Sequence, residues 1–398
     1  MKKTLRVKAF ITSTVTCLFI LVSLLSCATN TALYQAIKKD SVSRLEKWTI
    51  RSLSSIDKPI GSYGWKLIHA AAWYSSDSDL IDRLIINDLH PFTAEKLFGA
   101  TPLHIAAAMN SSPEIIKILI KKGNLVDVVD NNGETPLHWF ARYNNNINIL
   151  STLLQYNPPI NQKNKQGNTV LHLAIKNNQS YGIIKLLVDA NSNLNQENKE
   201  GLLPLSLLVQ SDKADPSIIE LLVTNGSFIN DKTRITEDTP LHIAARGNRN
   251  INILKALLNQ GASTKALNKN LLTALHEAAQ SNNNPEIIKL LVKYGSAINK
   301  KGGLYESTPL HLAAYGNPNP KIISTLISLG AAINAQDRDG DTPLQVALQN
   351  NPNRVHIAEE LLSYGANTKI KNKKGITAMQ LIKKDQLLWE SLRALFEE

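Results

Sequence analysis

A tetrapeptide of the form Thr-Pro-Leu-His recurs along the chain at nearly constant spacing. Intact copies begin at Thr101, Thr135, Thr239 and Thr308. Looser copies fill the gaps, so that successive starts fall at residues 66, 101, 135, 169, 203, 239, 273, 308, 342 and 377, separated by 34 to 36 residues. A fixed period of this length indicates one supersecondary unit repeated along the chain. The array escapes the two or three separate globular cores that 398 residues would otherwise suggest.

The residues of one copy predict a pair of short helices. Thr101 can cap a first helix, and Pro102 suits the first helical position because its missing N–H would have no partner there. Small residues such as Ala106 allow neighbouring units to approach closely. A second helix is expected to begin at Ser112, with a proline and an acid next in order, and to end at Gly123. One such unit cannot bury its apolar face alone, so the units must stack.

Turn residues separate the units and also join the two helices of each unit. Short extended pieces around a tight turn, as in 128–133 and 335–340, end in a glycine that supplies a positive φ angle, and we interpret them as projecting fingers. Most units carry an extra residue between their helices, often Asn, as at 144–146 and 282–284. Because Asn tolerates the left-handed conformation of turns, we interpret these segments as adapted loops.

Motif, period and copy number together resemble the ankyrin-repeat family over about residues 31–398. The resemblance implies an all-α fold (an α-solenoid), in which helix-turn-helix units with β-hairpin finger loops form a curved rod. On this basis residues 31–64 are a divergent N-terminal capping repeat, 65–376 an array of about nine repeats, and 377–398 a C-terminal capping repeat. Fingers and first helices would line the concave side.

The N-terminus has the layout of an export signal. Residues 1–9 carry four cations and no acid, and an apolar run follows to Leu25. The sequence Leu24-Leu25-Ser26-Cys27 resembles the lipobox of bacterial lipoproteins, which implies a signal peptide over 1–26, lipidation of Cys27 and a lipidated linker over 27–30. Several acyl chains anchor a protein firmly, here to the outer membrane or at the cell surface or periplasm. Cleavage after Ala28, giving a secreted soluble protein, and an uncleaved anchor are the alternatives.

The chemistry of the chain favours a non-enzymatic scaffold. The motif ends in a His that recurs at the same place in seven repeats, which indicates a structural role. In the ankyrin family the His at this place orients the finger through hydrogen bonds. No cofactor or metal site is expected, and no nucleotide-binding or hydrolase motif occurs. Cysteines occur only at positions 17 and 27, so the body of the chain has no thiol nucleophile. Seven of the nine histidines share the fourth place of the motif: His69, His104, His138, His172, His242, His276 and His311.

The net charge of +11 falls to +7 once the four cations of the export signal are removed. A solvated, lysine-bearing exterior explains this mild excess. An envelope structural or spacer protein whose basic fingers contact anionic lipid or polysaccharide is the alternative function. The charge is too diffuse to favour nucleic acid.

A protein partner is expected on the concave face, with the chain itself monomeric. In ankyrin proteins such contacts come from fingertips and from the exposed end of the first helix. Tyr and Arg are typical interface anchors, whereas Trp139 and Phe140 are expected in the core. The candidate contact residues are Asn131, Asn132, Glu134, Arg142, Tyr143, Lys165, Arg246, Lys269, Tyr305, Tyr315, Arg338 and Asp339.

One repeat departs from the pattern. The unit that begins at Leu203 has lost the motif His, and the fingers near Arg234 and Asn270 lack the usual Gly. These losses predict that residues 198–240 form the weakest seam of the array.

Overall fold

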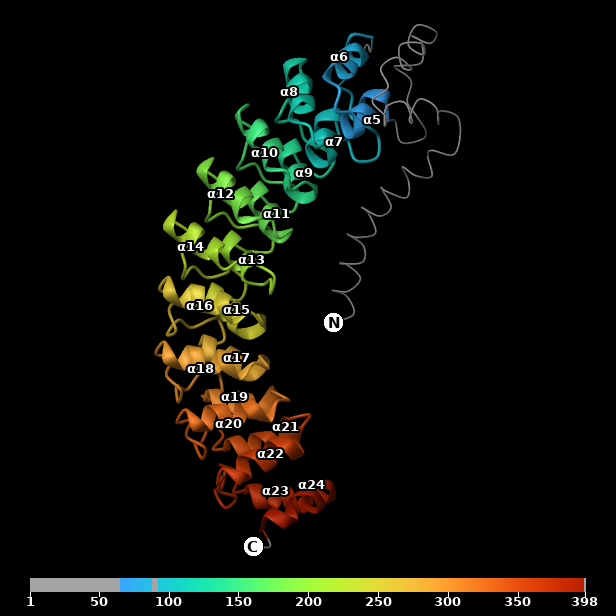
Figure 1. The fold of residues 1–398 in the computed structure, drawn as a ribbon. Coiled ribbons are helices and arrows are strands. Elements are labelled where there is room, and N and C mark those ends of the chain that lie inside the picture. The colour runs from blue at the N-terminus through green and yellow to red at the C-terminus, as the bar shows by residue number, and fades with distance from the viewer. Residues whose placement is uncertain (1–64, 88–91, 397–398) are drawn as a thin grey trace. The chain divides into compact units, whose positions relative to one another are not determined.

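Helix pairs make up both compact units of the protein. The computed structural model describes residues 65–87 and 92–396, and the chain divides after Ser192 into two units. In the first unit, first helices α5, α7, α9 and α11 follow one another, and second helices α6, α8, α10 and α12 lie beside them (Figure 1). Their bounds are α5 Leu67–Tyr74, α6 Ser78–Asn87, α7 Pro102–Met109, α8 Pro113–Lys121, α9 Pro136–Tyr143, α10 Ile147–Leu154, α11 Val170–Lys176 and α12 Tyr181–Asp189.

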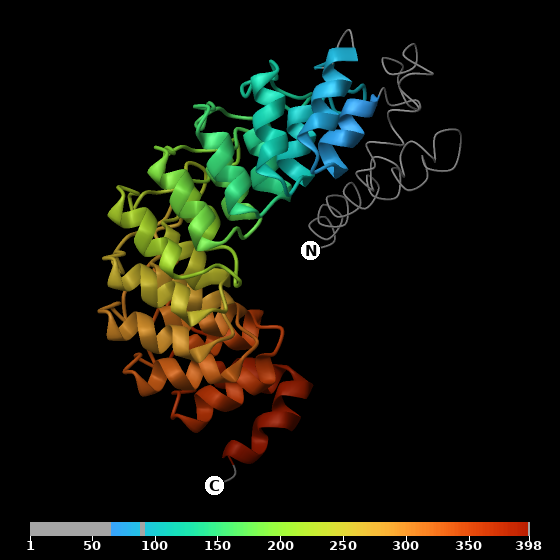
Figure 2. The same ribbon diagram turned by 45° about the horizontal axis from the view of Figure 1, so that its top comes forward.

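The second unit repeats this arrangement, with first helices stacked on first helices and second on second (Figure 2). Its last pair, α23 and α24, is followed by the short 3-10 helix η1 (Arg393–Phe396). The helix bounds are α13 Pro204–Leu208, α14 Ser217–Thr224, α15 Pro240–Gly247, α16 Ile251–Asn259, α17 Ala274–Ser281, α18 Pro285–Lys293, α19 Pro309–Gly316, α20 Pro320–Ser328, α21 Pro343–Asn350, α22 Arg354–Ser363, α23 Ala378–Lys384 and α24 Gln386–Leu392. The predicted all-α solenoid is confirmed.

The motif residues start the first helices as predicted. In α9, the Thr135 hydroxyl accepts the N–H of His138, and Pro136 occupies the first helical position. Thr308 caps α19 in the same way. Leu137 and Phe140 are buried, as is Trp139 apart from 6% of its surface. The prediction that Trp139 and Phe140 belong to the core is therefore confirmed.

The fingers between units are tight turns. In the finger before α9, the N–H of Asp130 donates to the carbonyl of Glu134 at 2.9 Å, and Gly133 adopts φ 72°. Isolated β-bridges pair Gly302 with Ser307 and Lys371 with Thr377, and the described residues contain no strand. The predicted hairpin fingers are thus present as turns, too short to form paired strands.

Amide side chains join consecutive repeats at the turn between the helices. Asn282 is typical: its Nδ2 donates to the carbonyls of Ala245 and Asn248, at 2.9 and 3.1 Å, and its Oδ1 accepts the N–H of Asn284. These bonds satisfy carbonyls left unpaired at the end of the preceding first helix. We call the residues that bond two carbonyls of the preceding repeat in this way the amide ladder: Asn110, Asn144, Gln179, Asn248, Asn282, Asn317 and Asn351.

The amide ladder corrects the interpretation of the asparagine-rich turns. Asn144 has φ −115° and ψ 148°, and Asn282 has φ −96° and ψ 129°, so both are extended rather than left-handed. The residues at 144–146 and 282–284 are absent from the positive-φ residues of the chain. Asn occurs there because its amide offers both a donor and an acceptor to buried backbone groups.

The repeat that begins at Leu203 has the features expected of the weakest part of the array. Its first helix, α13, has five residues, whereas the first helices α7, α9 and α15 have eight. Ser206 stands where other units have His, and its hydroxyl is buried with no hydrogen-bond partner in the described chain. An unsatisfied buried hydroxyl is destabilising.

We therefore expect backbone amides of residues 198–240 to exchange with deuterium faster than those of the flanking repeats, because local opening costs less where packing and hydrogen bonds are fewer. Exchange followed by mass spectrometry on the full chain would test this. Equal protection of this segment and of α15 to α18 would contradict it.

None of the helices in the described residues is both long and apolar enough to cross a membrane. The signal peptide over 1–26, the lipidated residue Cys27, the linker 27–30 and the capping repeat 31–64 lie outside the described residues.

Candidate functional site

The repeated histidines hold the fingers in place. Thr101 N–H donates to Nδ1 of His104 at 3.2 Å, and Nε2 of His104 donates to the carbonyl of Glu134 in the next finger at 2.9 Å. His311 makes the equivalent bond to the carbonyl of Asp341 at 3.0 Å. Burial lowers the pKa of His104 and of His311 to about 4, which keeps both imidazoles neutral. The structural role expected from the motif is confirmed.

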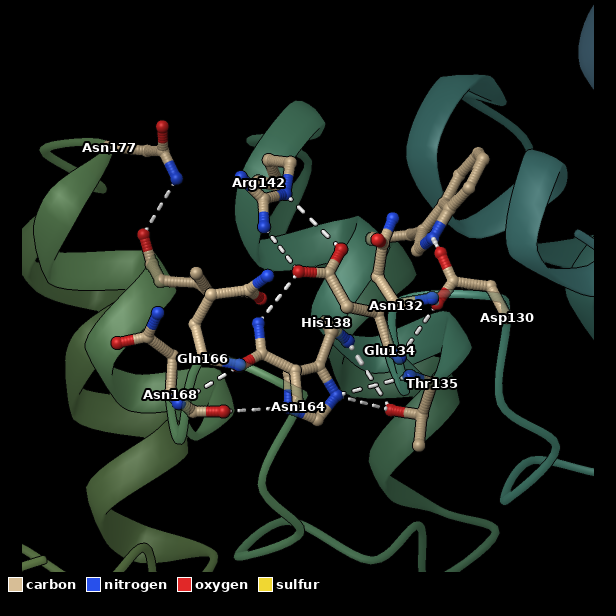
Figure 3. Close-up of polar contacts among 12 residues, drawn as sticks. Asp130, Asn132, Glu134, Thr135, His138, Arg142, Asn164, Gln166, Asn168 and Asn177 are labelled. Atoms are coloured by element: carbon tan, nitrogen blue, oxygen red, sulfur yellow. Dashed lines mark hydrogen bonds and ion pairs between the residues drawn. The ribbon is translucent and has the colours of Figure 1, made fainter. Parts of the chain in front are cut away.

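A carboxylate beside the motif threonine links each of three repeats to the next finger. Glu134, which precedes Thr135, accepts a hydrogen bond from Nδ2 of Asn164 at 2.8 Å and is ion-paired with Arg142 (Figure 3). We call this arrangement a carboxylate clip. Because Asn164 belongs to the following finger, the clip ties a first helix to the finger that projects next to it.

Glu134 was expected among the exposed contact residues, but the structure buries its side chain. Its side chain is only 4% exposed, and both carboxylate oxygens are engaged. A partner could reach it only by breaking these bonds, which would leave a buried charge unpaired. Glu134 instead positions Arg142, whose side chain is 23% exposed.

The second clip surrounds Arg246. Its Nε donates to Glu277 at 2.6 Å and its Nη2 to Asp238 at 3.0 Å, while Nδ2 of Asn268 bonds both carboxylates. The hydrogen bond with Glu277 raises the pKa of Arg246. Arg246 therefore remains charged, with 39% of its side chain exposed.

The third clip lacks a cation. Asn372 Nδ2 donates to Asp341 at 2.8 Å, and Gln349 takes the place of arginine with a 3.5 Å contact. The three clips share one sequence pattern, a carboxylate just before the motif threonine and an asparagine 30 or 31 residues later. Each clip stabilises a first helix against the next finger within its own unit, and two of them leave a partly exposed guanidinium.

The Tyr143 ring packs against a buried aromatic side chain. Its ring meets Trp139 edge-on with centroids 5.8 Å apart, and the Arg142 guanidinium lies 5.9 Å from its centroid. Trp139 is itself fixed by a hydrogen bond from Nε1 to Asp130 at 2.9 Å. With 40% of Tyr143 exposed, this rigid Arg-Tyr pair is suited to anchor a partner.

The other candidate residues lie on fingers or at first-helix ends. In the first unit, Asn131, Asn132 and Lys165 are exposed on consecutive fingers, joined by a 2.8 Å bond from Lys165 N–H to the Asn132 carbonyl. The second unit places Tyr315 at the end of α19, 48% exposed. It also places these residues on exposed fingertips: Lys269, Tyr305, Arg338 and Asp339.

Three exposed apolar residues escaped the sequence interpretation. Ile235, Leu271 and Leu304 lie on consecutive fingertips and are 58%, 55% and 79% exposed. Their signal was their position, two or four residues before the motif start, where most other repeats carry Gly, Lys, Asn or Arg. Leu97 of the first unit is a further exposed apolar residue at the equivalent place. Large apolar residues are usually assigned to the core, so the sequence interpretation did not identify these three as exposed.

Leu271 occupies the position that is glycine in fingers such as 130–134, and it adopts φ 60°. A left-handed conformation is strained for a residue with a side chain. We expect Leu271→Gly to stabilise the protein by about 0.5–1 kcal/mol, the strain relief being offset in part by the freedom of glycine when unfolded. Denaturant unfolding of the full chain measures this.

Leu304→Gly is the matched control, because Leu304 is also exposed on a fingertip but is not among the positive-φ residues. It should destabilise the protein slightly. Equal effects of the two substitutions would contradict the strain argument.

Among the described residues, no group of three or more His, Cys, Asp or Glu side chains could hold a metal ion. The geometry defines a stacked-repeat scaffold whose polar networks join repeats and whose exposed anchors lie on fingers and first helices. A family model for ankyrin repeats (three copies) matches residues 67–164, 103–198, 140–233, 205–302 and 298–372. The chain belongs to the ankyrin-repeat family.

Solved structures agree with this assignment of the fold, and 584 chains among them match. The human ASB11 ankyrin repeat domain is 24% identical with a TM-score of 0.50, the match covering 58% of this chain and 99% of that one. No curated protein matches this sequence. Ankyrin repeats are protein-interaction modules, so the comparisons support a scaffold for protein-protein interaction.

Proposed function

We propose that this protein is a non-enzymatic scaffold, exported and anchored to a membrane through Cys27, that captures another protein on its fingers and first helices. The observation that carries the binding role is the exposure of Tyr143 in the first unit and of Tyr305 and Tyr315 in the second, at 40%, 60% and 48%. Aromatic residues of this kind bury much area on binding at low cost in side-chain entropy. The repeated motif residues, by contrast, are occupied in forming the fold itself.

Electrostatics favour a protein over a polyanionic surface as the partner. We define the tip of a finger as the four residues that lie five to two positions before the motif start, such as 198–201. In the second unit, the tips of the six fingers together carry six cations and five anions. Such near-neutral tips gain little from anionic lipid or polysaccharide, since attraction scales with the excess of basic residues. The alternative of a spacer with basic fingers therefore lacks support at the tips.

Binding through the face predicts capture that tolerates salt. Tyr143→Ala and Tyr315→Ala, combined, should weaken partner capture at least tenfold while leaving the fold intact, because both side chains are exposed. Capture should change little between low and physiological ionic strength. Tyr181→Ala is the matched control, since Tyr181 is 40% exposed at the start of the second helix α12. A steep loss with salt, or equal loss in the control, would contradict the proposal.

The anchor is supported by Leu24-Leu25-Ser26-Cys27, with Ala28 after the cysteine. A lipidated Cys27 sends the protein into the detergent phase of a phase-separating extraction, whereas Cys27→Ala should leave it in the aqueous phase or block processing. Metabolic labelling with a palmitate analogue should follow the same pattern. Label in the Cys27→Ala variant, or none in the natural chain, would contradict lipidation.

A further inference from the structure

Three consecutive fingers of the second unit expose apolar side chains at their tips. Ile235, Leu271, Leu304 and Tyr305 are 58%, 55%, 79% and 60% exposed. We call these four residues the fingertip strip. Large apolar residues gathered on projecting loops typically mark a binding surface.

Backbone hydrogen bonds hold these fingers side by side. The N–H of Lys269 donates to the carbonyl of Thr236 at 3.0 Å, and the N–H of Gly303 to the carbonyl of Leu271 at 3.4 Å. On the far side, Arg338 N–H donates to the Tyr305 carbonyl at 2.7 Å. The apolar side chains are therefore presented on neighbouring fingers that are fixed to one another.

The same three fingers keep a strained backbone. Glu237, Leu271 and Glu306 adopt φ 54°, 60° and 51° at the position where the remaining fingers of this unit have Gly201, Gly340 or Gly375, all with φ from 72° to 77°. Strain retained in successive loops is typical of functional surfaces. Strain and apolar exposure thus coincide on the same three repeats.

The charge beside the fingertip strip that forms no salt bridge is net positive, because three cations stand against one exposed carboxylate, Asp339, which lies next to Arg338. The acids of these fingers are engaged, because Glu237 pairs with Lys232 at 3.2 Å, Glu306 with Lys301 at 4.0 Å, and Asp238 with Arg246. No carboxylate of the described chain forms a salt bridge with the flanking cations: Arg234, Lys269 and Arg338. A complementary ligand would bring apolar side chains together with carboxylates.

We propose that the fingertip strip binds a segment of another protein in which apolar residues are flanked by Asp or Glu. Its apolar side chains pack on Ile235, Leu271 and Leu304, and its carboxylates pair with the flanking cations. This inference rests on the proposed function and narrows the partner to an acidic, apolar segment. An anionic bilayer is the competing occupant, and the vesicle arm of the experiment distinguishes it from a peptide.

A random peptide library displayed on phage and selected on the full chain tests the proposal. Enriched peptides should combine apolar residues with Asp or Glu, and the tightest should be resynthesised as fluorescent probes. Leu271→Gly and Leu304→Ser should each weaken probe binding at least fivefold, and Lys269→Glu should do the same because it reverses the charge that faces the peptide carboxylates. Leu271→Gly relieves strain, so loss of binding in it cannot come from unfolding.

Phe228→Ser is the matched control, because Phe228 is 59% exposed in the same unit but follows the second helix α14. It should bind the probe as the natural chain does. Peptides that are basic or purely polar, or probes unaffected by the strip variants, would overturn the inference.

Vesicles of phosphatidylserine and phosphatidylcholine provide the competing arm. Vesicle binding lost in the strip variants, with no acidic peptide selected, would overturn the inference in favour of lipid. Peptides whose binding is lost in Tyr143→Ala or Tyr315→Ala but not in the strip variants would also overturn the inference. That result would leave the proposed function standing. If neither a peptide nor a protein ligand is found, both the inference and the proposed function are wrong.

Discussion

Acidification from pH 7 to pH 5 should lower the free energy of unfolding by about 6 kcal/mol through three buried histidines alone. The pKa of each of His69, His104 and His311 falls to about 4 in the folded protein because burial disfavours the charged imidazole. Their unfolded pKa is about 6.5. Stability from these groups is fully present above pH 6.5 and is lost as the pH falls toward 4. Each contributes about 2 kcal/mol of loss at pH 5.

The hydrogen bonds explain why protonation is costly. A proton on Nδ1 of His104 would face the N–H of Thr101, which that nitrogen accepts in the neutral state. Burial also lowers the pKa of His138, His242 and His276, so the loss extends to further repeats. Urea unfolding monitored by circular dichroism at pH 7, 6 and 5 measures the effect.

A later repeat of the same chain shows which residue can replace the motif His in a control variant. Gln345 stands at the histidine position of a later repeat, where its Oε1 accepts the Thr342 N–H at 2.8 Å and its Nε2 donates to the Ile376 carbonyl at 2.7 Å. His104→Gln with His311→Gln should keep these bonds without a titratable group. The loss from pH 7 to pH 5 should then shrink by about 4 kcal/mol. An unchanged loss would assign the acid sensitivity to other groups.

Asn282→Ala should destabilise the protein by about 3 kcal/mol, because it leaves two buried carbonyls and one partly buried N–H without a hydrogen-bond partner. The Asn282 side chain is 4% exposed, and its amide bonds the carbonyls of Ala245 and Asn248 and the N–H of Asn284. The substitution opens a seam between two repeats that otherwise pack closely. Unfolding in urea at pH 7 measures the cost.

Asn283→Ala is the matched control, with the same chemical change one residue away. Asn283 is exposed, and its side chain makes no hydrogen bond in the described chain. Its cost should be below about 0.5 kcal/mol. Similar costs for the two substitutions would show that the amide ladder contributes little.

The sequence predicted the framework because its residues act locally. Thr and Pro at a helix start, His three residues later and Gly in the turn each have one physical use. Bonds to the next repeat were harder to foresee. Asn282 was interpreted through its own backbone, whereas its amide satisfies carbonyls 34 and 37 residues earlier.

The candidate face was predicted in outline and wrong in detail. Fingertips and first-helix ends follow from the repeat, so Tyr143, Tyr305 and Tyr315 were identified correctly as exposed. Glu134 was misplaced because its burial depends on Asn164 of the next finger, which residue type and position do not reveal.

Site-specific photo-cross-linking in the producing cells tests most directly whether the fingers and first helices capture a protein. A benzophenone amino acid placed at Tyr143, Tyr305 or Tyr315 should cross-link one common protein. The same probe at Tyr156, Tyr181 or Tyr364, exposed tyrosines within or just after second helices, should capture none. Cross-links to a specific protein from the second set alone would contradict the account.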